Sequence, residues 1–230
     1  MLTDLISKKE IDQLIGIIIR EFKQKKEKIF TDLRESVRVY NDLVSESKTP
    51  IINNIHFQRK YFYFYAMSHI TIKNKDGKTR PELFDKFLNK YFELIDKKET
   101  RLPFIINELE QISGKTWFSY ATKLINMIDN TQPIFDSMIN KLIIKVVKDA
   151  KTEKSEIKKL LNKQSKNYEQ IYSSLKGIYE LLLKDKQIRA LVDKIKNEFK
   201  YNISYEKYLD FLLWWIGKEL TPKKKNKNIT

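Results

Sequence analysis

The sequence has no cysteine and very little glycine, proline or histidine. Its 230 residues include five Gly, five Pro and two His. Without cysteine the chain cannot form disulfides, use a thiolate nucleophile or hold a Cys-ligated metal centre. The few glycines and prolines exclude a many-turned β-sandwich and a low-complexity chain. Gly-rich phosphate loops, HExxH and GxSxG are absent too, and His56 and His69 lie far apart along the chain, so we expect no metal and no cofactor.

Long apolar runs are also missing. The longest, such as Leu14–Ile19 and Phe211–Ile216, are too short to span a bilayer. The first residues do not form a signal peptide, because Asp4, Glu10 and Asp12 interrupt them and no small-residue cleavage site follows. We therefore predict a cytoplasmic protein without a membrane partner.

Acidic residues are too few to balance the basic ones. Lys and Arg total 45 against 30 Asp and Glu, which gives a formal net charge of +15. Such a surplus attracts polyanions at long range. The alternative is a genomic composition bias toward Lys, Ile and Asn that implies no partner. We favour a nucleic-acid partner, DNA rather than RNA, and the sequence does not predict an oligomeric state.

The apolar residues recur mainly at helical spacing, so we predict an all-α fold. Ser7 and Glu10 form a capping box, and the polar run Gln24–Lys28 predicts two helices or one bent helix. The aromatic run His56–Tyr65 fits a strand or a buried helix, and Ile70–Lys78 has the turn signal of a small hairpin. Further helices are expected over 83–95, 102–112, 117–128, 138–146, 151–163, 168–183, 188–199 and 204–216.

No linker or internal repeat divides the chain. We expect one compact multi-helix domain over residues 1–221, with lobes 1–100 and 101–221 if it is bilobed. The lysine-rich tail, 222–230, is expected to be disordered.

The stretch near residues 102–129 has a helix-hairpin-helix plan. One helix ends at a two-residue break, Ser113-Gly114, and a second begins at once. Free backbone N–H groups and the positive end of the second helix suit a DNA phosphate. Ser113, Gly114, Lys115 at the corner and Trp117 beside it are therefore candidate nucleic-acid-binding residues. The alternative is an ordinary antiparallel helix pair.

Asp136 stands where the next helix begins, within Pro133–Ser137. An aspartate that starts a helix just beyond such a hairpin is the arrangement of helix-hairpin-helix DNA glycosylases. There the carboxylate faces a flipped-out nucleotide and stabilises positive charge as the glycosidic bond breaks. The alternative is that Asp136 only caps its helix.

Three short segments carry a resemblance to a known family: Trp117–Ile125, Pro133–Ser137 and Tyr208–Trp214. They resemble a family of uncharacterised bacterial all-α proteins that is similar to the helix-hairpin-helix 8-oxoguanine DNA glycosylases. The resemblance implies base excision, with a damaged base extruded into a pocket between two helical lobes and Asp136 as the catalytic aspartate.

The resemblance is incomplete at the hairpin. Only Gly114 of the usual two glycines is present, and the family's Schiff-base lysine aligns near Phe118. Lys115 and Lys123 are the neighbouring lysines, and Lys115 is the nearer substitute on a helix. Each is a candidate catalytic nucleophile or a phosphate contact, so strand cleavage is not predicted.

The sequence therefore supports a DNA-binding protein, with a glycosylase-like base-excision enzyme as the leading hypothesis. The alternatives are a basic helical nucleic-acid-binding protein without catalysis and a host-defence interaction protein.

Overall fold

The structure is a computed structural model that describes residues 7–67, 81–149 and 167–221. These residues form helices and no strand, so the prediction of an all-α fold is confirmed. The helices are α1 (Lys8–Glu46), α2 (Ile55–Phe64), α3 (Pro81–Asp96), α4 (Leu102–Ser113), α5 (Phe118–Ile128), α6 (Ser137–Asp149), α8 (Tyr168–Lys184), α9 (Lys186–Phe199) and α10 (Tyr205–Leu220). The expected hairpin at 70–78, helix at 151–163 and tail at 222–230 lie outside the described residues.

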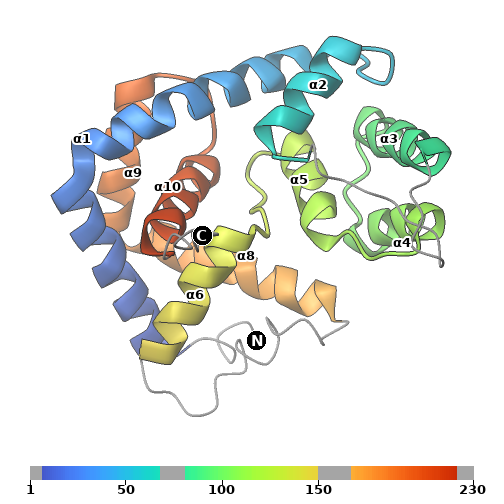
Figure 1. Cartoon of the computed structure of the whole chain (residues 1–230). Helices are drawn as coiled ribbons and strands as arrows, with labels where there is room; N and C mark the ends of the chain where they lie inside the picture. The colour runs from blue at the N-terminus through green and yellow to red at the C-terminus, as the bar shows by residue number, and fades with distance from the viewer. Residues whose placement is uncertain (1–6, 68–80, 150–166, 222–230) are drawn as a thin grey trace, which may run out of the picture.

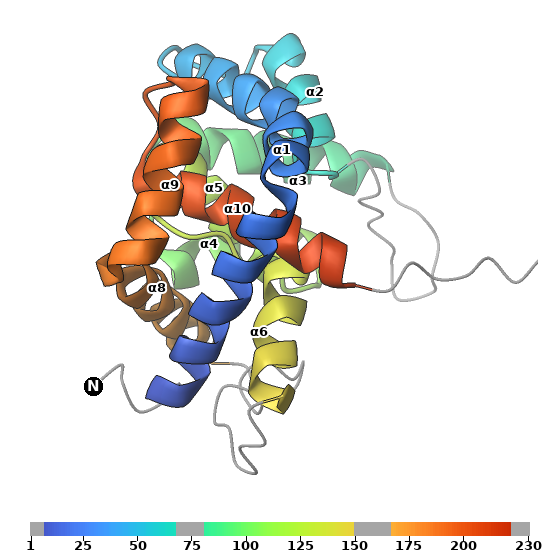
Figure 2. The same cartoon turned by 90° about the vertical axis from the view of Figure 1, so that its left-hand side faces the viewer.

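Helix α1 begins at the capping box that the sequence predicts and bends once. The Ser7 side chain accepts from the backbone N–H of Glu10, while the Glu10 carboxylate accepts from that of Ser7. The bend lies at Lys25, whose φ and ψ are not helical, inside the polar run Gln24–Lys28. Figures 1 and 2 show α1 turning partway along its length, so that its second part runs toward α2.

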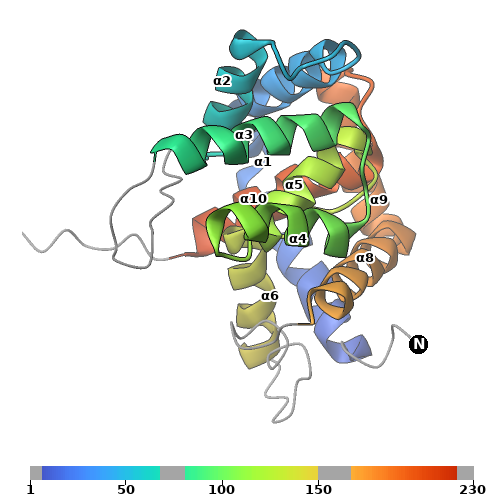
Figure 3. The same ribbon diagram turned by 90° about the vertical axis from the view of Figure 1, so that its right-hand side faces the viewer.

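The other helices form two groups that share one apolar core (Figure 1). Helices α3, α4 and α5 pack on one another on one side, as Figure 3 shows. On the other side α10 is central and contacts α1, α6, α8 and α9. Helices α4 and α5 thus pack with α3, across the lobe boundary that we expected at residue 100.

The aromatic run His56–Tyr65, which by sequence fits either a strand or a buried helix, lies mostly in helix α2. Residues 55–64 are helical, and Phe57 and Tyr61, one turn apart, are both fully buried. Asn54 caps the helix by accepting from the N–H of Phe57, at 2.9 Å. The Asp96 carboxylate at the end of α3 accepts from the N–H groups of Ile51 and Ile52, which holds the loop before α2 in place.

Among the described residues, no helix combines the length and the apolar composition that crossing a membrane requires.

Candidate functional site

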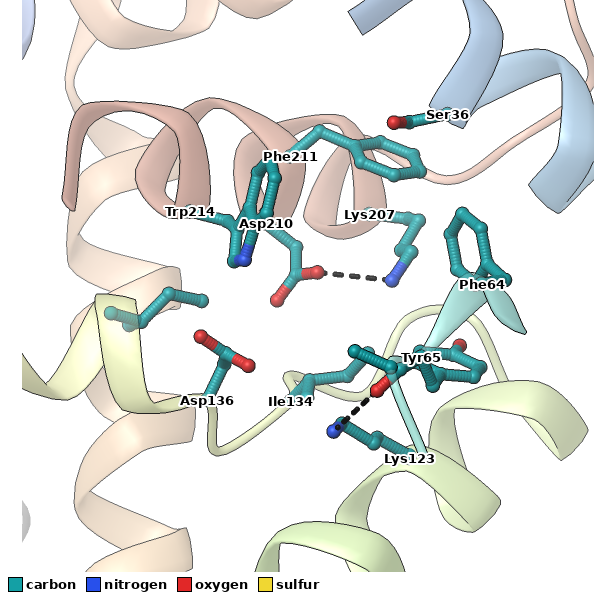
Figure 4. Close-up of a pocket in the computed structure, with 12 residues that line it drawn as sticks. Ser36, Phe64, Tyr65, Lys123, Ile134, Asp136, Lys207, Asp210, Phe211 and Trp214 are labelled. Atoms are coloured by element: carbon teal, nitrogen blue, oxygen red, sulfur yellow. Dashed lines mark hydrogen bonds and ion pairs between the residues drawn. The ribbon is translucent and has the colours of Figure 1, made fainter. Parts of the chain in front are cut away.

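A cavity of about 140 Å³ lies where both helix groups meet (Figure 4). A cavity of about 150 Å³ in another protein admits benzene, so this space is on the scale of one flat aromatic ring. Its walls come from α1, the end of α2, α5, the start of α6 and α10. The lining residues are Ser36, Phe64, Tyr65, Ala66, Lys123, Ile134, Asp136, Ile139, Lys207, Asp210, Phe211 and Trp214.

Asp136 both caps α6 and faces this cavity. Its Oδ1 accepts from the N–H of Met138 at 2.7 Å, and its carbonyl accepts from the N–H of Asn140 at 2.9 Å. This confirms Asp136 as the N-cap of its helix. Oδ2 has no hydrogen-bond partner within the described part of the chain, and the half-buried carboxylate points toward α10 in Figure 4. One oxygen therefore holds the helix, and the other faces the cavity.

Lys123 is a buried lysine whose ammonium reaches the same cavity. Its Nζ donates to the carbonyl of Tyr65 at 3.3 Å and lies 5.1 Å from the ring centre of Tyr120. No carboxylate lies within ion-pair distance of it among the described residues. Burial lowers the pKa of Lys123 and Lys207 adds to the effect, while Asp136 and Asp210 act in the opposite direction. At a given pH, a larger fraction of Lys123 than of an exposed lysine is therefore in the neutral amine form, which is the nucleophilic one.

A second lysine and a second carboxylate, Lys207 and Asp210, line the opposite wall. They form a buried ion pair on α10, and Tyr179 donates to the other oxygen of Asp210 at 2.9 Å. The Lys207 ammonium also lies 4.5 Å from the ring centre of Tyr40. Burial lowers the pKa of Lys207, and Asp210 opposes that shift.

Sequence reasoning did not select this pair. The available signal was two charged residues, three positions apart, that are the only charged residues in the stretch 207–217. Trp214 follows on the same helix and lines the cavity half-buried, whereas its neighbour Trp215 is in the core and donates to Asp32 at 2.9 Å.

The hairpin residues lie together but outside the cavity. Gly114 ends α4 in the left-handed region, with φ +66°, and Lys115 beside it is exposed. Ser113 is buried and accepts from Nε1 of Trp117 at 2.6 Å. The Trp117 ring packs on Phe87 and Tyr120. Trp117 therefore stabilises the corner, and only Lys115 of the four candidates presents an exposed charge.

Helix α5 connects the hairpin corner with the cavity. Lys115 precedes its first turn at the exposed corner, and Lys123 lies in its middle at the cavity. The structure thus brings Lys123 and Asp136 together and places Lys115 elsewhere.

The residues that the structure describes include no cluster of three or more side chains able to hold a metal ion. His56 is exposed on α2, and His69 lies outside the described residues.

Comparisons with protein-family models, with curated proteins and with solved structures found no significant match to this chain.

Proposed function

We propose that the protein is a base-excision DNA glycosylase that acts on a nucleotide flipped out of the duplex. The observation that carries this proposal is that Lys123 and Asp136 both line one cavity on the scale of an aromatic ring. A buried amine with a lowered pKa can act as the nucleophile, and a carboxylate with one uncommitted oxygen can stabilise the positive charge that develops as the glycosidic bond breaks.

The chemistry divides between the two side chains. As the bond from C1′ to the base breaks, positive charge develops on the sugar, and the Asp136 carboxylate stabilises it. The neutral Nζ of Lys123 attacks C1′ and gives up a proton, while the departing base gains one. The C1′–O4′ bond then breaks as the nitrogen lone pair forms the C1′=N bond of the Schiff base, and O4′ takes up a proton. Loss of a proton from C2′ can then expel the 3′ phosphate, which cleaves the strand. The structure favours Lys123 over Lys115 for this role, because Lys115 is exposed outside the cavity.

The remaining features suit DNA as the substrate. Aromatic side chains of Phe64, Phe211 and Trp214 line the cavity and can contact the faces of a base. The net charge of +15 favours the DNA backbone, and the exposed Lys115 offers its ammonium to a phosphate. The backbone N–H groups of Gly114 and Lys115 do not add to this, because they donate to the Glu110 carbonyl and to the Ser113 hydroxyl. A function on cellular DNA agrees with the cytoplasmic location that the sequence predicts.

The proposal is tested by trapping the Schiff base with borohydride on duplexes that carry 8-oxoguanine, other damaged bases or an abasic site. We expect the wild-type chain to form a covalent adduct and Lys123→Met to form none. Lys115→Ala is the matched control and keeps the adduct, since that lysine is outside the cavity. An adduct that survives Lys123→Met, or that requires Lys115, contradicts the assignment of the nucleophile.

A further inference from the structure

The loop of residues 129–136 joins the helices of the two proposed catalytic side chains. It runs from α5, which carries Lys123, to the first turn of α6, which Asp136 caps. Ile134, within the loop, is buried and lines the cavity. The place of Asp136 relative to Lys123 therefore depends on how this loop is fixed to α5.

One face of α5 holds the loop at three points. Phe118, Thr122 and Asn126 follow one another at intervals of four residues, so their side chains project on the same face of the helix. The Phe118 ring packs on the Phe135 ring, with 4.6 Å between the ring centres. The Thr122 hydroxyl accepts from the N–H of Phe135 at 3.0 Å. Nδ2 of Asn126 donates to the carbonyl of Gln132 at 2.5 Å.

The hydrogen bond of Thr122 lies closest along the chain to both proposed catalytic side chains. Thr122 directly precedes Lys123, and Phe135 directly precedes Asp136. Thr122 is fully buried, and its hydroxyl donates to the carbonyl of Ser119 at 2.9 Å. Because its hydrogen is committed to Ser119, the hydroxyl oxygen is left as the acceptor for the N–H of Phe135.

Loss of this hydroxyl would leave the N–H of Phe135 without its acceptor. An unpaired N–H that faces the protein interior is unfavourable, so the loop would shift until the N–H finds another acceptor or water. Asp136, as the next residue, would move with it. A displacement of about 1 Å at a reacting group can lower a rate by about 100-fold.

We infer that Thr122 is a positioning residue, whose hydroxyl sets the place of Asp136 relative to Lys123 by holding the N–H of Phe135. Thr122 is not among the residues that line the cavity, so it acts through the loop. Its effect on a reaction rate rests on the proposed function. The place of Asp136 is also measurable without catalysis, because its negative charge raises the pKa of Lys123.

The first test is NMR of the full chain labelled with carbon-13 at the lysine Cε atoms. The signal of Lys123 is the one absent from Lys123→Met, and its shift is followed against pH. We expect Thr122→Val, which has nearly the same shape but no hydroxyl, to lower the pKa of Lys123 toward that in Asp136→Asn. Thr122→Ser keeps the hydroxyl and should keep the wild-type pKa.

Ser174→Ala is the matched control for the loss of a buried hydroxyl. Ser174 donates to the carbonyl of Gln170 within α8 and does not line the cavity. The variant should therefore leave the pKa of Lys123 at its wild-type value.

The second test is single-turnover base release with the same variants. We expect the rate for Thr122→Val to fall by about 10- to 100-fold with unchanged duplex affinity, and Thr122→Ser to keep the wild-type rate. Hydrogen exchange at the Phe135 amide of the wild-type chain tests the contact even where Thr122→Val does not fold. We expect that amide to be protected, and exchange as fast as at an exposed amide overturns the inference.

Two further results overturn it: a wild-type pKa of Lys123 in Thr122→Val, or the same impairment in Thr122→Ser as in Thr122→Val. A pKa of Lys123 that depends on the Thr122 hydroxyl, without base release from any damaged duplex, upholds the inference and refutes the proposed glycosylase. Base release by Thr122→Val at the wild-type rate refutes the inference and leaves the glycosylase in place.

Discussion

Lys207 and Asp210 form an ion pair inside the protein, one turn apart on α10, with Nζ 3.0 Å from Oδ2. Their side chains are only 2% and 8% exposed. Tyr179 donates to the remaining oxygen, so both oxygens of Asp210 are bonded. The pair also forms one wall of the cavity that Lys123 and Asp136 share.

Removal of one partner from this pair should be strongly destabilising. In Lys207→Met, Asp210 keeps only the tyrosine hydroxyl, and an uncompensated buried charge costs about 3–5 kcal/mol. Equilibrium unfolding in urea measures the loss. The control is Arg38→Met, because Arg38 pairs with Glu35 at the exposed surface of α1. Exposed pairs contribute about 0–1 kcal/mol, so similar losses in both variants would contradict the account.

Gly217→Ala should disrupt the packing of α6 on α10. A Cβ at Gly217 would lie 2.3 Å from the carbonyl oxygen of Met138, which is backbone and cannot rotate away. Overpacking of this kind costs about 1–3 kcal/mol, and the displaced first turn of α6 moves Asp136, so base release falls as well. Thermal unfolding and single-turnover base release measure the two effects.

Gly16 provides the matched control for Gly217, because a Cβ there meets no atom within 4 Å. Gly16→Ala in α1 should raise stability by about 0.5–1 kcal/mol through the higher helix propensity of alanine. A neutral Gly217→Ala would show that the contact between α6 and α10 is looser than described.

The rate of adduct formation should depend on pH through Lys123. Burial lowers its pKa below the ordinary value of 10.5, so the neutral amine is populated at lower pH than in an exposed lysine. The rate therefore rises with pH and levels off before 10.5 is reached. Borohydride trapping at a series of pH values measures this profile, and a rate that still rises in parallel with the titration of an exposed lysine would argue against Lys123.

Lys115 should contribute to DNA affinity without contributing to chemistry. If it contacts one phosphate, Lys115→Ala reduces the slope of log K against log salt by about 0.9 for a duplex. Lys194→Ala on α9, also exposed and away from the hairpin, should leave the slope unchanged. Fluorescence anisotropy at several salt concentrations gives the slopes. Equal slopes for wild type and Lys115→Ala would remove the corner from the DNA interface.

Local signals in the sequence predicted local structure well. The capping box at Ser7, the bend within Gln24–Lys28 and the N-cap at Asp136 all depend on neighbouring residues, and the structure confirms each. The aromatic run of α2 was ambiguous, because its helical form is selected by burial of Phe57 and Tyr61 against α3 rather than by local preference.

The site was predictable only in part, since it is formed by helices that are distant in sequence. Asp136 was found from its place at a helix start. Lys123 was one of two lysines that the sequence offered as the nucleophile. Helical spacing from Phe118 favoured the other, Lys115, but the packing of the helices places Lys123 at the cavity. Lys207 and Asp210 face that cavity only because α10 packs against α1, α6 and α8, which spacing along the chain does not reveal.

The central claim is tested most directly by single-turnover base release from a panel of damaged duplexes, with wild type and Asp136→Asn compared. Asparagine caps a helix as well as aspartate does, so the variant should fold and bind DNA as the wild type does. The account predicts that the wild-type chain releases a damaged base and that Asp136→Asn, with unchanged duplex affinity, releases none. Release by Asp136→Asn at the wild-type rate, or no release by the wild-type chain from any duplex in the panel, would contradict it.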